Sequence, residues 1–106
     1  LKQIGQIIKS SIRDIDVAFR YGGGLLTIIF PITDAEGARI VTEKIREKIE
    51  EFPFEEQEAL PNKNLTISGG IAAYDSKIKT SEEFFDRAIR LLQKAEFEGR
   101  NKLYIG

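Results

Sequence analysis

Hydrophobic residues recur at helical spacing in three stretches of the chain. Isoleucines at three- and four-residue intervals predict an amphipathic helix over residues 1–12. A capping box at residues 33–36 predicts a second helix that runs to about residue 51. Another capping box at residues 80–83 predicts a third helix, which reaches about residue 98 and stops at Gly99.

The segments between these helices have the patterns of β-strands. Residues 17–21 alternate, three glycines supply a turn, and residues 25–30 form a second strand. That second strand is apolar on both faces, so we expect it inside a sheet. Residues 65–74 predict a strand interrupted by glycines, and residues 102–105 a short closing strand. This order predicts an α/β (α+β) sandwich in which helices flank a mainly antiparallel sheet.

Length and composition restrict the chemistry. The 106 residues allow one domain, and the net charge of −1 argues against a general DNA or RNA binder. Without Cys or His, there is no thiolate, no catalytic triad with histidine and no metal ligand other than oxygen. No apolar run reaches the roughly 20 residues of a membrane span. Because the chain has no Met, even at position 1, we expect it to be part of a longer protein.

Three segments carry a family resemblance. They are Arg-Tyr-Gly-Gly-Gly-Leu-Leu at residues 20–26, Leu-Thr-Ile-Ser-Gly-Gly-Ile-Ala at residues 65–72, and the stretch from Ala88 to Gly99-Arg100-Asn101. In order and spacing they resemble GGDEF domains, the diguanylate cyclases that make cyclic di-GMP from two GTP. The resemblance covers nearly all of residues 1–106. It implies a single nucleotidyl-cyclase-like domain with a ferredoxin-like palm that lacks its central first strand, which would leave strand edges unpaired.

The chain departs from the family at the residues that would carry catalysis. Active members have two acidic residues after the paired glycines, which hold magnesium and activate the attacking hydroxyl. Here those positions are Gly24 and Leu25, and the family's phosphate-binding Lys aligns with Glu96. The resemblance therefore implies a degenerate site without catalysis or bound metal. The degenerate turn comprises Gly22, Gly23, Gly24, Leu25 and Leu26.

Arg13 and Asp16 form an Arg-x-x-Asp motif shortly before the glycine turn. This placement resembles the family's inhibitory site, which binds cyclic di-GMP. A guanidinium fork can donate to guanine O6 and N7, and a carboxylate can accept from the guanine N1–H and amino group. We expect both side chains to project from one exposed turn. The alternative is a surface ion pair worth about 0–1 kcal/mol.

Three further cations are candidates. The family's site often includes a cation from the following helix, for which Lys44 is the aligned residue and Arg46 its neighbour. Arg100 remains from the family's phosphate-binding segment. Its alternative role is that of a cation at a helix C-terminus.

These observations predict a cytoplasmic regulatory domain of bacterial signal transduction. Its expected ligand is cyclic di-GMP, and its expected partners are other domains of a longer signalling protein and a second copy in a homodimer. Two alternatives stay open. One is a structural dimerisation or docking domain without ligand, and the other is a weak diguanylate cyclase.

Overall fold

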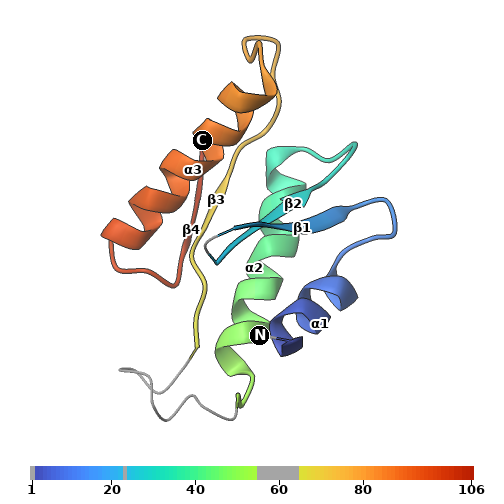
Figure 1. The fold of residues 1–106 in the computed structure, drawn as a ribbon, viewed down its shortest axis with the longest axis vertical. Helices are drawn as coiled ribbons and strands as arrows, with labels where there is room; N and C mark the ends of the chain where they lie inside the picture. Colours follow the sequence, from blue (N-terminus) through green and yellow to red (C-terminus); the bar gives the residue numbers. More distant parts are fainter. Residues whose placement is uncertain (1, 23, 55–64) are drawn as a thin grey trace.

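The fold, a computed structural model, is described for residues 2–22, 24–54 and 65–106 (Figure 1). The elements in chain order are α1 (Lys2–Ser11), β1 (Val17–Gly22), β2 (Leu25–Ile29), α2 (Ala35–Glu51), β3 (Gly69–Ile71), α3 (Ser81–Phe97) and β4 (Leu103–Ile105). The helices and strands follow one another in the predicted order, which is thereby confirmed. The sequence also predicts a loop over residues 52–62, most of which lies outside the described residues.

The main core lies where α1 meets α2. Ile8 of α1 packs with Ile45 and Ile49 of α2 and with Phe54, which follows that helix. Ile28 of β2 packs against the same cluster from the hairpin. The three- and four-residue spacing of the isoleucines aligns them on one face of each helix, which is why both helices bury a stripe there.

The predicted hairpin forms as an antiparallel pair of β1 and β2. Val17 pairs with Ile29, and a β-bulge lies between Arg20 and Gly22. The prediction that the second strand lies inside a sheet is wrong, because among the described residues β2 pairs with β1 alone. Leu26 and Ile29 are accordingly 42% and 52% exposed.

A second two-stranded sheet packs against α3. β3 and β4 run parallel, with Gly69 opposite Leu103 and Ile71 opposite Ile105. The strand expected over residues 65–74 is shorter than predicted, because only three of its residues form a ladder with β4. Among the described residues the strands thus form two separate pairs, one antiparallel and one parallel. This division agrees with the expectation of unpaired strand edges.

The first turn of α2 differs from the predicted capping box. Asp34 is the N-cap, and its Oδ1 accepts a hydrogen bond from the Gly37 N–H at 2.8 Å. Thr33, expected as the cap, lies one residue further out. In α3 the prediction is confirmed, since Thr80 Oγ1 accepts from the Glu83 N–H at 3.0 Å.

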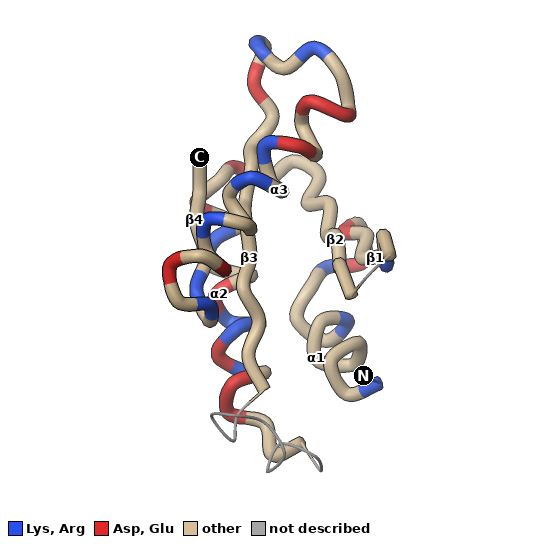
Figure 2. The backbone as a smooth tube through the Cα atoms, turned by 60° about the vertical axis from the view of Figure 1, so that its left-hand side comes forward, with Lys and Arg blue, Asp and Glu red and all other residues tan. Residues whose placement is uncertain are grey.

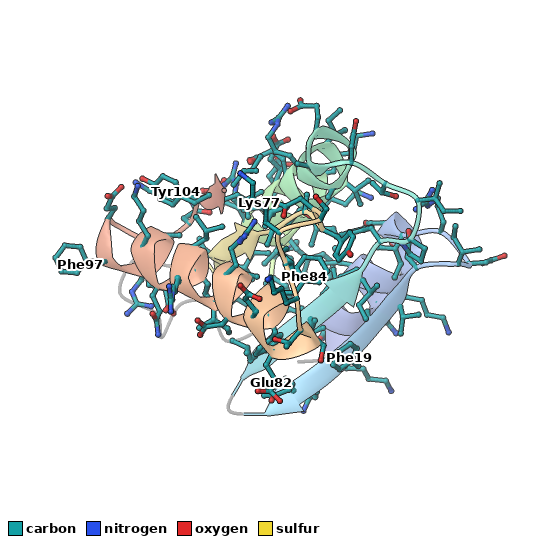
Figure 3. The ribbon with its side chains drawn as sticks, turned by 90° about the horizontal axis from the view of Figure 1, so that it is seen from above. Phe19, Lys77, Glu82, Phe84, Phe97 and Tyr104 are labelled. Atoms are coloured by element: carbon teal, nitrogen blue, oxygen red, sulfur yellow. The ribbon has the colours of Figure 1, made fainter. Side chains whose placement is uncertain are left out.

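The surface carries both charge and exposed apolar groups. Lys and Arg alternate with Asp and Glu along α2 (Figure 2). Ile15, in the turn before β1, and Val17, Phe19 and Tyr21 of β1 are each at least 39% exposed. Phe97 is 91% exposed and points away from the end of α3 (Figure 3). In the part of the chain that the structure describes, no helix is long and apolar enough to cross a bilayer.

Candidate ligand-binding site

The site begins at the turn that joins α1 to β1. The helix stops at Ser11, and the backbone N–H of Asp16 then donates to the Arg13 carbonyl at 3.0 Å. In return, Asp16 Oδ2 accepts from the Arg13 backbone N–H at 2.8 Å. These reciprocal bonds close a compact turn with Arg13 and Asp16 at its two ends, three residues apart.

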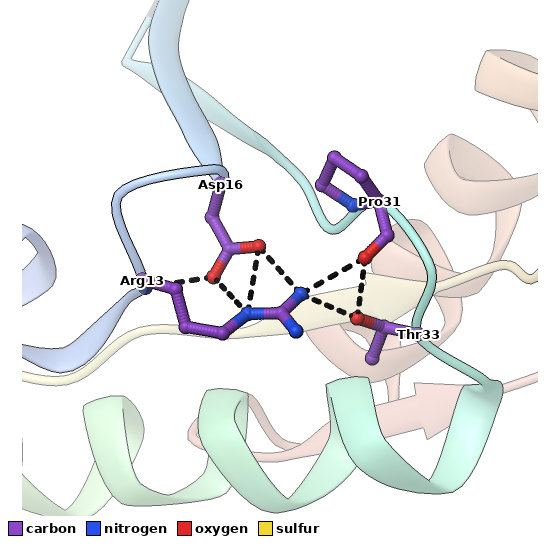
Figure 4. A network of polar contacts seen from close by, with 4 residues as sticks. All are labelled: Arg13, Asp16, Pro31 and Thr33. Atoms are coloured by element: carbon purple, nitrogen blue, oxygen red, sulfur yellow. Dashed lines mark hydrogen bonds and ion pairs between the residues drawn. The ribbon is translucent and has the colours of Figure 1, made fainter.

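The two side chains of the motif form a bidentate ion pair. Arg13 Nε donates to Asp16 Oδ2 at 3.1 Å, and Nη2 donates to Oδ1 at 2.8 Å (Figure 4). The Asp16 side chain is 1% exposed, whereas that of Arg13 is 51% exposed. The expectation that both side chains project into solvent therefore holds for Arg13 only. The buried carboxylate orients the guanidinium.

This pairing changes the acidity of both groups. The hydrogen bond from Arg13 lowers the pKa of the Asp16 carboxyl below its ordinary value. The same bond raises the pKa of Arg13. Asp16 is thus an anion at neutral pH and Arg13 a cation, and the Arg13 side chain as a whole is half exposed.

The loop before α2 also contacts Arg13. Arg13 Nη2 donates to the Pro31 carbonyl at 2.9 Å and to Thr33 Oγ1 at 2.6 Å. The Thr33 hydroxyl in turn donates to the Pro31 carbonyl at 2.9 Å (Figure 4). Arg13 Nη1 makes no hydrogen bond to any residue that the structure describes, so it is the free corner of the guanidinium.

The two predicted cations on α2 lie on opposite sides of the stripe of Ile45 and Ile49 that packs against α1. Lys48 Nζ donates to Ser11 Oγ at 3.1 Å, which identifies the face of α2 nearest the end of α1. Lys44 precedes Lys48 by four residues and therefore shares that face. Arg46 lies roughly 200° around the helix from Lys48 and faces away from the end of α1.

Arg46 belongs to a different network. Its side chain is 15% exposed and pairs with Glu43 and Glu50 of the same helix. Its Nη1 also donates to Asn101 Oδ1 at 2.8 Å, and Asn101 Nδ2 donates to Glu50 Oε2 at 2.6 Å. These contacts join α2 to the segment before β4, and they do not bring Arg46 to Arg13.

Arg100 lies just after α3. Its side chain is 71% exposed, and Nη1 is 3.8 Å from Glu96 Oε2. This residue has a positive φ of 65°, and its N–H donates to the Ala95 carbonyl at 2.9 Å, which closes the end of the helix. Glu96 thus places a carboxylate next to Arg100, at the position where the resemblance to the family expects a lysine.

The glycine turn carries no ionisable side chain. Gly22 and Gly24 have φ values of 129° and 79°, and a Cβ built on either would meet no atom within 4 Å. Gly23 lies outside the described residues. Neither these glycines nor Leu25 offers an oxygen ligand from a side chain. Throughout the described ranges, no group of three or more acidic residues is placed to hold a metal ion.

Sequence reasoning missed two residues around the turn between α1 and β1: Thr33, which contacts Arg13, and Lys48, which contacts Ser11. Thr33 was interpreted as a helix cap, but adjacent Asp34 takes that role and leaves the Thr33 hydroxyl for Arg13. The presence of two capping residues side by side is the signal that could have revealed this. Lys48 could have been found from its position one helical turn after Lys44.

The sequence profile described as "Diguanylate cyclase, GGDEF domain" matches residues 1–102. The chain therefore belongs to the GGDEF family. This confirms the family and the fold class expected from the three sequence segments. The curated relatives include diguanylate cyclase A of Treponema denticola, which is 31% identical over 105 residues. That match covers 97% of this chain and 27% of the relative.

Two solved structures are similar over almost the whole chain. The active GGEEF domain of a diguanylate cyclase from Vibrio cholerae superposes with a TM-score of 0.88 at 28% identity, covering 99% of this chain and 65% of that one. The GGDEF domain of DgcB from Caulobacter crescentus, in complex with c-di-GMP, has a TM-score of 0.84 at 22% identity. There the match covers 96% of this chain and 60% of the other.

Proposed function

We propose that this chain is a catalytically inactive GGDEF domain that binds cyclic di-GMP through Arg13. One observation carries the proposal. The half-exposed side chain of Arg13 is oriented by a carboxylate that is 1% exposed, and Nη1 is free among the described residues. An isolated surface ion pair would leave both partners in water, whereas here the carboxylate is buried and holds a guanidinium suited to bidentate recognition.

The chemistry of this site suits a guanine base. Guanine O6 and N7 accept two hydrogen bonds from one guanidinium fork. Asp16 contributes by positioning Arg13, since its own oxygens already accept from the Arg13 backbone and side chain. Lys44, on the same side of α2 as Lys48, supplies positive charge for the two ligand phosphates. The DgcB structure with c-di-GMP shares this fold and supports the choice of ligand.

The proposed loss of catalysis rests on the glycine turn. Phosphoryl transfer depends on positioning and on charge stabilisation by metal ions. Gly24 and Leu25 offer no carboxylate for magnesium, and Glu96 repels a polyphosphate next to Arg100. Removal of one electrostatic element commonly costs roughly 100- to 1,000-fold in rate. We therefore assign no catalytic residue, metal or cofactor to this chain.

Calorimetric titration with cyclic di-GMP tests the binding proposal. The wild type is expected to bind, and the Arg13→Ala variant to lose at least roughly tenfold in affinity, the effect of losing one bidentate base contact. The Arg39→Ala variant removes another arginine paired within one helical turn, with Glu36, and is the matched control. No heat from the wild type at high micromolar ligand would reject the proposal.

A turnover assay tests the loss of catalysis. The chain is incubated with GTP and magnesium, and the products are separated by chromatography. We expect no cyclic di-GMP above the level of a heat-denatured sample. Product formation would instead establish the weak diguanylate cyclase.

A docking domain without ligand is the second candidate. The observation that favours it is the group of exposed apolar residues formed by Ile15 in the preceding turn and Val17, Phe19 and Ile29 of the hairpin. In that case the domain would bind other parts of a signalling protein in the cytoplasm or a second copy of itself. Light scattering would then show a defined oligomer, while titration with cyclic di-GMP would give no heat.

A further inference from the structure

The edges of the Arg13 guanidinium differ in whether an incoming base can bind to them. A guanidinium is planar, and its Nη2 carries one hydrogen on the Nε side and one on the Nη1 side. The Nε side is taken by Asp16, which binds Nε and Nη2 together. A base that accepts two hydrogen bonds must therefore approach the opposite edge, between Nη1 and Nη2.

The second hydrogen of Nη2 is already bound to the loop before α2. The Pro31 carbonyl and Thr33 Oγ1 lie 2.9 Å and 2.6 Å from Nη2. Both acceptors lie on the side of Nη2 away from Asp16 (Figure 4). Nη1 alone would give one nitrogen donor, and a bidentate contact requires Nη2 as well.

The loop is built to keep this contact. Thr33 is not used as the α2 cap, and its methyl group lies against the first turn of the helix, where a Cβ built on Gly37 would be 2.9 Å from Thr33 Cγ2. The Thr33 hydroxyl also donates to the Pro31 carbonyl, so the two acceptors hold each other in place. The hydroxyl is thus positioned from two sides.

Ile32, between the two acceptors, shows that the loop conformation is under strain. Its φ is 50° and the residue is 97% exposed, so its side chain does not stabilise this conformation by packing. A β-branched residue at positive φ is unusual and costs free energy. The bonds from Arg13 to residues 31 and 33 bridge this residue and stabilise the strained loop.

We propose that the Pro31–Thr33 loop competes with the cyclic dinucleotide for Arg13 Nη2. This inference rests on the proposed function, because it concerns the same guanidinium. The loop lowers the affinity for the ligand, since the contact with Thr33 must break before a guanine can bind both Nη1 and Nη2. By linkage, a bound ligand releases the loop at the start of α2.

Substitution of Thr33 separates this competition from binding itself. Thr33→Val removes the acceptor with little change in shape, and Thr33→Ser retains it and is the matched control. Calorimetric titration of the full chain with cyclic di-GMP is expected to show roughly three- to tenfold tighter binding for Thr33→Val, the effect of removing one competing hydrogen bond. Thr33→Ser is expected to stay within about twofold of the wild type. Thr33→Ala is a second variant without the hydroxyl, should Thr33→Val fail to fold.

Each outcome distinguishes the two proposals. If the wild type binds and Thr33→Val binds equally or more weakly, the competition is overturned and the proposed function stands. Heat from Thr33→Val but none from the wild type would support the competition and overturn ligand binding by the native chain. Absence of heat from every variant would overturn both. Both proposals would also be overturned if Arg13→Ala bound cyclic di-GMP as tightly as the wild type does.

Discussion

Asp16 is the residue on which the geometry of the site depends. Its carboxylate accepts from the backbone N–H, the Nε and the Nη2 of Arg13, and its side chain is 1% exposed. A carboxylate so enclosed is stable only because every one of those donors is in place. The direction of the Arg13 side chain therefore follows from the position of a residue that solvent barely reaches.

The lowered pKa of Asp16 predicts a specific pH dependence of stability. Because the folded pKa lies below the unfolded value of about 3.9, the contribution of the ionised group is fully present above that value. It is lost as the pH falls through the folded pKa. Asp16→Asn removes the contribution, so the difference in unfolding free energy from wild type is expected to be largest at neutral pH and to shrink below about pH 4.

Urea denaturation between pH 7 and pH 3 measures this difference. Asp14→Asn is the control, since Asp14 lies in the same turn, is exposed and makes no hydrogen bond to a described residue. The difference in unfolding free energy between Asp14→Asn and the wild type should stay small between pH 7 and pH 3. A constant difference between Asp16→Asn and wild type at all these pH values would contradict the assigned ion pair.

The close approach of β3 to α3 controls the packing of the second sheet. A Cβ built on Gly70 would lie 2.1 Å from the Ala88 carbonyl oxygen and 2.4 Å from the Leu92 nitrogen. Both atoms belong to the helix backbone and cannot rotate away. A glycine in a strand is commonly explained by such an approach of another backbone.

Gly70→Ala is therefore expected to destabilise the fold by about 3 kcal/mol, at the upper end of the cost of overpacking. Gly5→Ala is the matched control, because Gly5 lies in α1 with no atom within 4 Å of a built Cβ. It should stabilise the chain by about 0.5–1 kcal/mol through helix propensity. Chemical denaturation of both variants measures the two effects. A Gly70→Ala variant as stable as the wild type would show that β3 and α3 are further apart than the structure has them.

Across the whole molecule, Asn101 connects three distant segments. Its side chain bonds Arg46 and Glu50 of α2, and its backbone N–H donates to Ser68 Oγ at 3.0 Å. Asn101 also has a positive φ of 51°, a conformation that asparagine tolerates better than most residues. The segment before β4 is thereby held against both α2 and the start of β3.

Two substitutions separate the hydrogen bonds from the backbone conformation. Asn101→Ala loses both side-chain contacts and adds the cost of a positive φ, so we expect a loss of about 2–3 kcal/mol. Asn101→Gly loses the same contacts without the conformational cost and should be about 1 kcal/mol more stable than the alanine variant. Urea denaturation of both variants compares these values. Equal stability of the two would contradict the left-handed backbone at this residue.

Much of the fold could be predicted because its elements depend on local patterns. The isoleucines of residues 1–12 and the cap at Thr80 specify helices through neighbours three or four residues away. The strand over residues 65–74 was predicted too long for the opposite reason. A strand ends where its partner ends, and β4 lies more than thirty residues further along the chain.

The sequence by itself determined the family, the order of helices and strands, and the missing carboxylates at Gly24 and Leu25, because residue identity and local spacing suffice for these. Only the tertiary structure decided that Asp16 is buried, that Arg46 bonds Asn101 instead of approaching Arg13, and that Thr33 holds the Arg13 guanidinium. The physical reason is that hydrogen bonds are short. A polar side chain bonds whichever partner the packing of helices and strands brings within about 3 Å, and that partner can lie anywhere in the sequence.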